Sequence, residues 1–327
     1  MASHRARQEP NPPTERAHRG PGRLAVVIPS LGSSELSRCL NAVTALDPAP
    51  DLVVVVLSGG AQAPNGAANT EVLSISERLG FAAAVNLGIQ RAASTAEAIA
   101  LLNDDAEPPT QWLGMLAEAL ADDPDLAAVQ GTVTDRSGER TDGRGIALDR
   151  LYLPVQIDHG TPATLDDRGS QAILATSGTA ALYRTKALLA ASSGDAAPFD
   201  PTFGSYHEDL DLGLRLARLG WRAAWVGGAP TRHLGSGTGK LLGWRHPWWI
   251  LANRWRALAG NLTAGAFIGA LPQAARGELR AIRTLARHNP RSLAASVAVL
   301  ATWPTLVAGG FRRQTPGPRL ADLAGGR

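Results

Sequence analysis

Short, continuous apolar runs that alternate with helical segments constrain the fold of this chain more than any other feature. A continuous apolar run bounded by turn residues is typical of a parallel strand that is buried on both faces. Such runs occupy residues 23–30, 51–60, 70–75, 96–108 and 126–133. Segments with helical periodicity lie between them, at residues 34–46, 80–93 and 110–121. The alternation predicts an α/β fold with a doubly wound, mostly parallel sheet that binds ligands at the carboxyl ends of its strands.

Composition limits the classes of function. The chain has 327 residues, of which 44% are hydrophobic, so it can form one large α/β domain with an extension or two modest domains. The net charge of +3 is too small to favour a nucleic-acid partner. Lys186 and Lys240 are the only lysines. Arginine therefore carries the positive charge, which suits phosphate recognition but also follows from GC-rich coding. Cys39 is the only cysteine, and we expect it in the core.

The two ends of the chain differ from its middle. Residues 1–22 have no apolar signal-peptide segment and are rich in Pro, Arg and Glu, which predicts a disordered tail. The periodicity fades between residues 135 and 175, where we expect a long loop or insertion near a site. Beyond residue 240 the chain is rich in Trp, Arg and Ala with helical spacing. We therefore predict an α/β domain over residues 23–240 and a helical extension over residues 241–327.

A run of polar side chains, Asn103, Asp104 and Asp105, follows one buried strand directly. These side chains are expected at the carboxyl edge of the sheet. Paired carboxyl oxygens suit a hard divalent cation that also takes phosphate oxygens. The alternative is an Asx turn that ends the strand before Pro108. His233 follows another strand, and it is either a structural histidine or a further contact for a metal or diphosphate.

A later predicted helix begins with three acids, Glu208, Asp209 and Asp211. Acids are favoured at helix N-termini, which explains one or two of them. At about 100° per residue, one stripe of this helix carries Glu208, Asp211, Arg215 and Arg218. We expect this stripe to be solvated or partly paired, with an i,i+4 pair between Asp211 and Arg215. Asp209 lies off the stripe on the apolar side, where a carboxylate needs a partner or a chemical task.

These motifs, in this order, resemble the family 2 glycosyltransferases, which have the GT-A fold, and in particular their bacterial rhamnosyltransferase-like branch. The resemblance runs from about Leu24 to Lys240. Its first half is carried by AVVIPS, GFAAAVNLGI and LLNDDAEP. Its second half is carried by SGTAALYRTKAL, by FDPTFGSYHEDLDLGLRLARLGWRAAWV, which is long and specific, and by APTRH. It implies an inverting enzyme that moves a sugar from a nucleotide-sugar donor to a glycan or lipid-linked glycan in cell-wall or surface polysaccharide synthesis.

The resemblance also assigns roles to residues. Asp105 would hold a divalent cation, Mg²⁺ or Mn²⁺, on the donor diphosphate, with Asn103 and His233 completing the metal site. Asp209 would be the general base, with Glu208 beside it in the catalytic pair. The residues that would bind the donor nucleotide are Pro29, Ser30, Gly80, Phe81, Asn86 and Asp104.

This chain departs from the family pattern around the nucleotide pocket. The family has an Asp after the second strand, whereas this chain has Leu57 followed by Ser58 and two glycines. Arg78-Leu79 also stands where the family has an Asn before the Gly-Phe pair. Two alternatives follow: a non-catalytic relative that acts as a scaffold or partner, and a nucleotidyltransferase that releases pyrophosphate.

The predicted C-terminal helices suggest contact with a membrane. Residues 243–262 interleave tryptophans with arginines, as at a membrane interface, although a helix packed on the catalytic domain has the same pattern. Residues 292–310 are apolar for nearly the length of a bilayer span, but Pro304 is expected to break them. We expect a buried or interfacial helix there rather than a spanning one. Together with the resemblance, this predicts a cytoplasmic protein that is peripheral at the inner face of the membrane.

Overall fold

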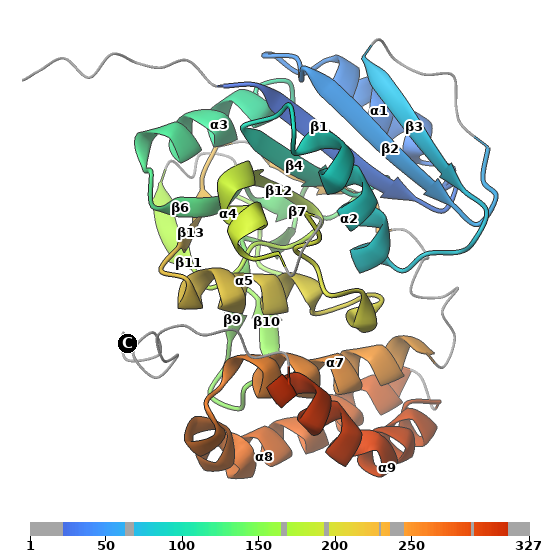
Figure 1. The fold of residues 1–327 in the computed structure, drawn as a ribbon, viewed down its shortest axis with the longest axis vertical. Coiled ribbons are helices and arrows are strands. Elements are labelled where there is room, and N and C mark those ends of the chain that lie inside the picture. The colour runs from blue at the N-terminus through green and yellow to red at the C-terminus, as the bar shows by residue number, and fades with distance from the viewer. Residues whose placement is uncertain are drawn as a thin grey trace, which may run out of the picture.

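The structure is a computed structural model that describes residues 22–62, 69–164, 169–192, 196–228, 230–235, 245–288 and 291–312. The predicted tail, residues 1–22, lies outside the described residues except for Gly22. The chain folds into an α/β body with a bundle of helices at one end (Figure 1).

An eight-stranded sheet forms the centre of the body, in the order β11-β13-β6-β12-β4-β1-β2-β3. The strands are β1 (Leu24–Ser30), β2 (Leu52–Ser58), β3 (Thr70–Ile75), β4 (Ala98–Leu102), β6 (Leu126–Gln130), β11 (Ser170–Ile173), β12 (Ala180–Arg184) and β13 (Arg222–Val226). β1 pairs in parallel with β2 and β4, and β13 pairs in parallel with β6. β12 is antiparallel to both of its neighbours, and β11 is antiparallel to β13. The predicted α/β fold with a mostly parallel sheet is confirmed.

Helices cover both faces of this sheet, and this explains the continuous apolar strands. One face packs against α1 (Leu36–Thr44) and α3 (Trp112–Asp122). The other face packs against α2 (Phe81–Ala92), α4 (Thr185–Ala190) and α5 (Glu208–Arg218). Alternate residues from Leu24 to Ile28 of β1 belong to different core clusters, so all of these positions are apolar. Cys39 is buried in the first cluster, as expected.

The segment in which a long loop was expected instead contains short strands. They include β8 (Thr141–Gly143), β9 (Ile146–Leu148) and β10 (Pro154–Gln156), and they follow β7 (Val133–Thr134), which lies just before the segment. β7 and β8 join β5 (Ala106–Glu107) and β14 (Thr231–His233) in a second sheet. Strands of two or three residues are too short to give a periodic sequence pattern. Their pairing has a consequence for the site, because β14 places His233 opposite Ala106.

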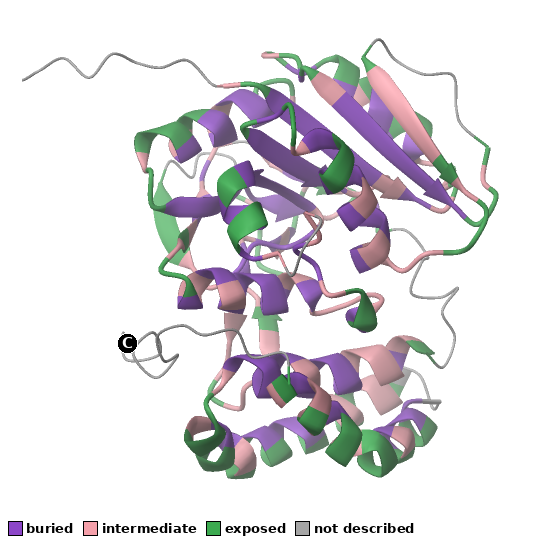
Figure 2. Cartoon of the chain, in the orientation of Figure 1, coloured by how far each residue is buried: buried purple, intermediate pink, exposed green. Residues whose placement is uncertain are grey.

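The C-terminal extension is a bundle of α7 (Arg245–Asn261), α8 (Ala264–His288) and α9 (Arg291–Arg312). Its core includes the rings of Trp255, Phe267 and Trp303. Figure 2 shows α7 largely buried between the α/β body and the rest of the bundle. Of the two interpretations of residues 243–262, the structure therefore supports a helix packed on the α/β body for the described part, Arg245–Asn261.

Helix α9 differs from its prediction in two respects. It continues through Pro304 rather than breaking there. It is also the one helix of the described residues that is long and apolar enough to cross a membrane, and only 28% of its most apolar stretch is buried. Its outward side carries Leu293, Val297 and Leu300, which are 57–68% exposed. The helix is therefore mostly exposed rather than buried.

Candidate active site

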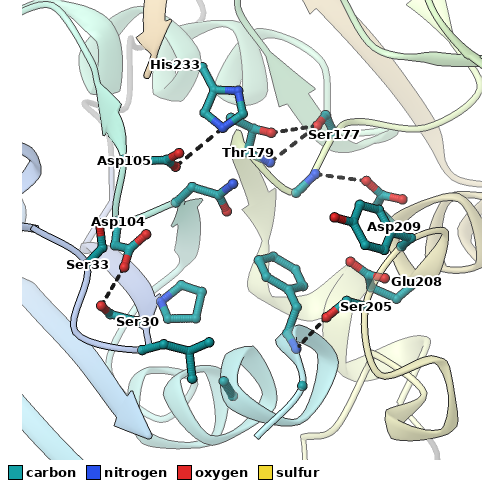
Figure 3. A pocket seen from close by; sticks show the side chains of 18 of the residues that line it. Ser30, Ser33, Asp104, Asp105, Ser177, Thr179, Ser205, Glu208, Asp209 and His233 are labelled. Carbon is teal, nitrogen blue, oxygen red and sulfur yellow. Dashed lines mark hydrogen bonds and ion pairs between the residues drawn. The ribbon is translucent and has the colours of Figure 1, made fainter. Parts of the chain in front are cut away.

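A cleft of about 1320 Å³ lies at the carboxyl edge of the parallel strands. It collects residues from elements that are far apart in the sequence: the end of β1, the segment after β4, and the N-termini of α2, α5 and α7. The predicted site residues that line it are Pro29, Ser30, Gly80, Phe81, Asn103, Asp104, Asp105, Glu208, Asp209 and His233. In Figure 3, Asp105 and His233 lie on one wall and Glu208 and Asp209 on another.

Asn86 is the exception, and its predicted contact with the nucleotide is wrong. It lies on the buried side of α2 and is only 6% exposed. Its amide nitrogen donates to the Phe199 carbonyl (2.6 Å), and its amide oxygen accepts from the Phe199 N–H (3.0 Å). Both amide atoms are thus used to pair with a backbone segment, which is a structural role.

The two acids after β4 have different surroundings. Asp104 accepts a hydrogen bond from the Ser30 hydroxyl at 2.5 Å. Burial raises the pKa of Asp104 to about 6, and the charge of Asp105 adds to this, although the Ser30 hydroxyl opposes it. Asp105 is only 1% exposed and lies 3.4 Å from Nε2 of His233. The two carboxylates therefore point to different partners rather than sharing one.

His233 lies between two carboxylates. Its Nδ1 is 2.8 Å from Asp142, which is on β8, and its Nε2 faces Asp105. Burial alone would lower the pKa of His233, but its hydrogen bonds to Asp105 and Asp142 raise it to about 9. Sequence reasoning missed Asp142, because nothing distinguished it within an irregular segment rich in Gly, Arg and Asp.

The residues on this wall fit a divalent cation only in part. Among the described residues, no group of three or more His, Cys, Asp or Glu side chains could hold a metal. Asp105 and His233 could supply two ligands, and Mg²⁺-type sites are often completed by water and substrate phosphates. Asn103 lines the cleft, but its predicted ligation stays a prediction. A cation bound here would displace the His233 proton and would need oxygens from a bound donor.

Asp209 is held at the opposite wall by backbone N–H groups. Its carboxylate accepts from the Gly178 N–H (3.1 Å) and from the Leu210 N–H (2.8 Å). Burial raises the pKa of Asp209, and these backbone donors oppose the rise. Glu208 is 5% exposed and one of its carboxyl oxygens has no hydrogen bond. Burial, together with the neighbouring Asp209 charge, raises the pKa of Glu208 well above its ordinary value.

This arrangement separates the roles of the pair. Two acids whose environments differ titrate apart, and the more desolvated one keeps its proton. Burial and the Asp209 charge favour the protonated form of Glu208, whereas two N–H donors stabilise the charge of Asp209, so Asp209 is the better placed of the two to accept a proton from a ligand in the cleft.

The charged stripe of α5 was expected to be solvated or partly paired, and it is buried and partly paired. Glu208, Asp211 and Arg218 are 3–8% exposed. The predicted pair between Asp211 and Arg215 is confirmed at 2.9 Å. Asn261 of α7 donates to the other oxygen of Asp211 (2.9 Å), and Arg218 donates to a carbonyl of α7. The stripe is buried because α7 covers it, and the spacing within α5 alone could not reveal that cover.

Comparison with known proteins gives one family match and several similar folds. The model of the family described as glycosyltransferase like family 2 matches residues 21–254. No curated protein matches the chain. The crystal structure of GalNAc-T7 with UDP, GalNAc and Mn²⁺ has a TM-score of 0.56 at 15% identity, over 74% of this chain and 48% of that one. The mannosyltransferase PcManGT from Pyrobaculum calidifontis, in complex with GDP-Man and Mn²⁺, has a TM-score of 0.49 at 19% identity, over 89% of this chain and 86% of that one.

The chain thus spans about half the length of GalNAc-T7, and the likeness shows a shared GT-A fold. The rhamnosyltransferase-like branch stays a prediction.

Proposed function

The chain belongs to the family 2-like glycosyltransferases, and from this premise we propose that it is an inverting enzyme that moves a sugar from a nucleotide-sugar donor to a glycan or lipid-linked glycan. The observation that carries the proposal is the position of Asp209. This carboxylate lies at the cleft, fixed by two backbone N–H groups, across from the wall that carries Asp105 and His233. A base and a diphosphate site on opposite walls are what a single displacement requires.

The reaction follows from this geometry. The acceptor hydroxyl oxygen attacks the anomeric carbon of the donor and forms the new glycosidic bond. Its proton passes to the Asp209 carboxylate. The bond between the anomeric carbon and the diphosphate oxygen breaks, and its electron pair leaves with the nucleoside diphosphate. A divalent cation, when bound, would neutralise the charge that develops on the diphosphate.

The proposed donor side of the cleft lies between β1 and α2. Pro29 and Ser30 end β1, Gly80 and Phe81 lie at the beginning of α2, and all four residues line the cleft. A side chain on Gly80 would come within 2.6 Å of the Gly204 carbonyl, so only glycine fits there. Arg78 also lines the cleft and adds a guanidinium that can bind phosphate.

The proposed acceptor side lies beyond Asp209, where α7 reaches the cleft. Tyr206 and Trp249 line it, as does Arg245 at the beginning of α7. Aromatic rings offer apolar faces to sugar rings, and arginine pairs with phosphate. These residues support a glycan acceptor, including one linked to a lipid through phosphate, as in cell-wall or surface polysaccharide synthesis.

We further propose that the protein is peripheral at the inner face of the membrane. The exposed apolar side of α9 and the exposed arginines of α8, Arg276 and Arg283, support this, because apolar surface and positive charge together favour anionic lipid. Flotation with vesicles of neutral lipid and of neutral lipid with phosphatidylglycerol tests it. Failure to float with the anionic vesicles would refute the membrane contact.

The function is tested first by a thermal-shift panel of nucleotide sugars and nucleoside diphosphates, with and without Mg²⁺ or Mn²⁺. A ligand at about 100 times its Kd stabilises a fold by about 2.7 kcal/mol. We expect a metal-dependent shift for one nucleotide class, and release of nucleoside diphosphate when an acceptor is added. A folded protein that binds no donor would instead be the non-catalytic relative, and release of pyrophosphate would indicate nucleotidyl transfer.

A further inference from the structure

The turn that leads into α5 has an unusual backbone. It follows the 3₁₀ helix η1 (Pro201–Phe203), and its residues Gly204, Tyr206 and His207 have φ angles of 66°, 74° and 67°. This left-handed region favours glycine, and side chains such as those of Tyr and His disfavour it. Such a backbone persists only where surrounding contacts determine it. The turn therefore depends on atoms outside itself.

Asn253 of α7 supplies those contacts. It is fully buried, and its amide nitrogen lies 2.7 Å from the Phe203 carbonyl, 3.0 Å from the Ser205 carbonyl and 2.8 Å from the Tyr206 carbonyl, so its two hydrogens are shared among three acceptors. Its amide oxygen accepts from the guanidinium of Arg256 at 2.6 Å. Because carbonyls only accept and a guanidinium only donates, the orientation of the amide is fixed.

The same turn connects both sides of the cleft. The Gly204 carbonyl accepts from the Ala82 N–H (3.1 Å), and the Ser205 hydroxyl accepts from the Phe81 N–H (3.4 Å), both at the beginning of α2. On its other side the turn runs directly into Glu208 and Asp209. Its shape therefore fixes the start of the donor-side helix relative to the proposed base.

We propose that Asn253 is a positioning residue: through its hydrogen bonds to the turn at residues 203–207, it aims Asp209 into the cleft. Helix α7 then contributes a residue that shapes the active site, rather than serving only to attach the protein to a membrane. The catalytic part of this inference rests on the proposed function, whereas the structural part does not.

The chain provides a matched control in Asn261. It is the same residue type on the same helix, is 3% exposed, and donates to Asp211 (2.9 Å) and to the Ala257 carbonyl (2.9 Å). Neither of these hydrogen bonds goes to the turn. Asn261→Ala therefore removes a buried amide that bonds α5 while leaving the proposed positioning contacts in place.

The test compares Asn253→Asp and Asn253→Ala with Asn261→Ala in the full chain. Aspartate at residue 253 fills the same space and still accepts from Arg256, but it has no N–H to donate. Hydrogen exchange of the amides of residues 203–210 is measured by mass spectrometry. Donor turnover per folded molecule is measured as release of nucleoside diphosphate from the nucleotide sugar selected by thermal shift.

We expect exchange of residues 203–210 to become at least about tenfold faster in both Asn253 variants, and kcat to fall by about 10–10²-fold with the donor KM within about threefold. Asn261→Ala should lower the melting temperature without either change. Unchanged exchange and kcat in Asn253→Asp would overturn the proposal, as would equal losses of kcat in the Asn253 and Asn261 variants.

Two further outcomes are distinguishable. If the wild-type protein turns over no donor, the proposed function fails, and the exchange measurement alone still decides whether Asn253 holds the turn. If neither Asn253 variant folds, Arg256→Gln is the milder substitution, because it replaces the long guanidinium that orients the Asn253 amide and also donates to the Thr202 carbonyl, and it leaves Asn253 in place. Exchange in residues 203–210 that matches wild type in Arg256→Gln would then count against the proposal.

Discussion

Replacing Asp209 with asparagine separates its proposed chemistry from its structural role. The amide cannot accept the acceptor proton, and loss of a general base costs about 10²–10⁴-fold in rate, or about 2.7–5.4 kcal/mol in activation free energy. The structural cost is smaller and can be worked from two contacts. The carboxylate accepts two backbone N–H groups, from Gly178 and Leu210, and an amide has only one oxygen to accept them.

One of these N–H groups would therefore lose its acceptor, at a cost of about 1–3 kcal/mol in folding free energy. Removing the charge also removes the desolvation cost of burying the Asp209 carboxylate, so the net loss should lie near the lower limit. The assay is single-turnover transfer at saturating donor, normalised to the folded fraction, with donor Kd measured in parallel. A folded Asp209→Asn that transfers sugar within threefold of the wild-type rate would refute the assignment of the base.

Further predictions follow from particular contacts. Because burial raises the folded-state pKa of Glu208, folding takes up a proton, so wild-type stability should fall as pH rises above about 4.5, by up to about 1.4 kcal/mol per unit. Glu208→Gln should make stability less dependent on pH, raise the melting temperature at pH 8 and retain turnover within about tenfold. If the pH profile of unfolding is unchanged in this variant, burial does not raise the pKa of Glu208. Asp105→Asn should abolish the metal-dependent part of the donor thermal shift, and a full shift with Mn²⁺ would remove Asp105 from the cation site. Gly88→Ala should lower the free energy of unfolding by about 1–3 kcal/mol, because the added Cβ would lie 2.2 Å from the Val27 side chain. Gly269→Ala, at an open position of α8, should instead raise it by up to about 1 kcal/mol. Urea denaturation measures both variants, and equal midpoints for the two would contradict this packing of α2 on β1.

The sheet could be predicted because burial on both faces leaves a direct record in sequence. β1 and β2 are apolar at nearly every position, and the acids that follow β4 must then lie at the carboxyl edge. The N-terminus of α5 was recognisable for a similar reason, since its acids exceed what capping needs. These signals are local, so they can be recognised in the sequence without any knowledge of the fold.

The residues that sequence reasoning missed or assigned to another role depend on tertiary partners. Asn86 lies in a helix segment that suggested nucleotide contact, yet Phe199, more than a hundred residues away, takes both of its amide atoms. Asp142 gains its role only when β8 and β14 come together at His233. The charged stripe of α5 has the spacing of a solvated face and is buried nevertheless, because that spacing does not say which helix lies above it.

The cover over α5 also bears on where the functional unit ends. The change of composition near residue 240 suggested a boundary there, with an accessory extension beyond it. Contacts along α7 argue otherwise: Trp249 packs on Gly204, Asn253 bonds the turn, and Asn261 bonds Asp211. These positions are four and eight residues apart, so they lie on one face of α7, and that face follows α5 from its strained start into its second turn. Helix α7 buries the charged stripe and, through Asn253, bonds the turn before Asp209, so we propose that the functional unit extends past residue 240 to include the Asn253 contacts.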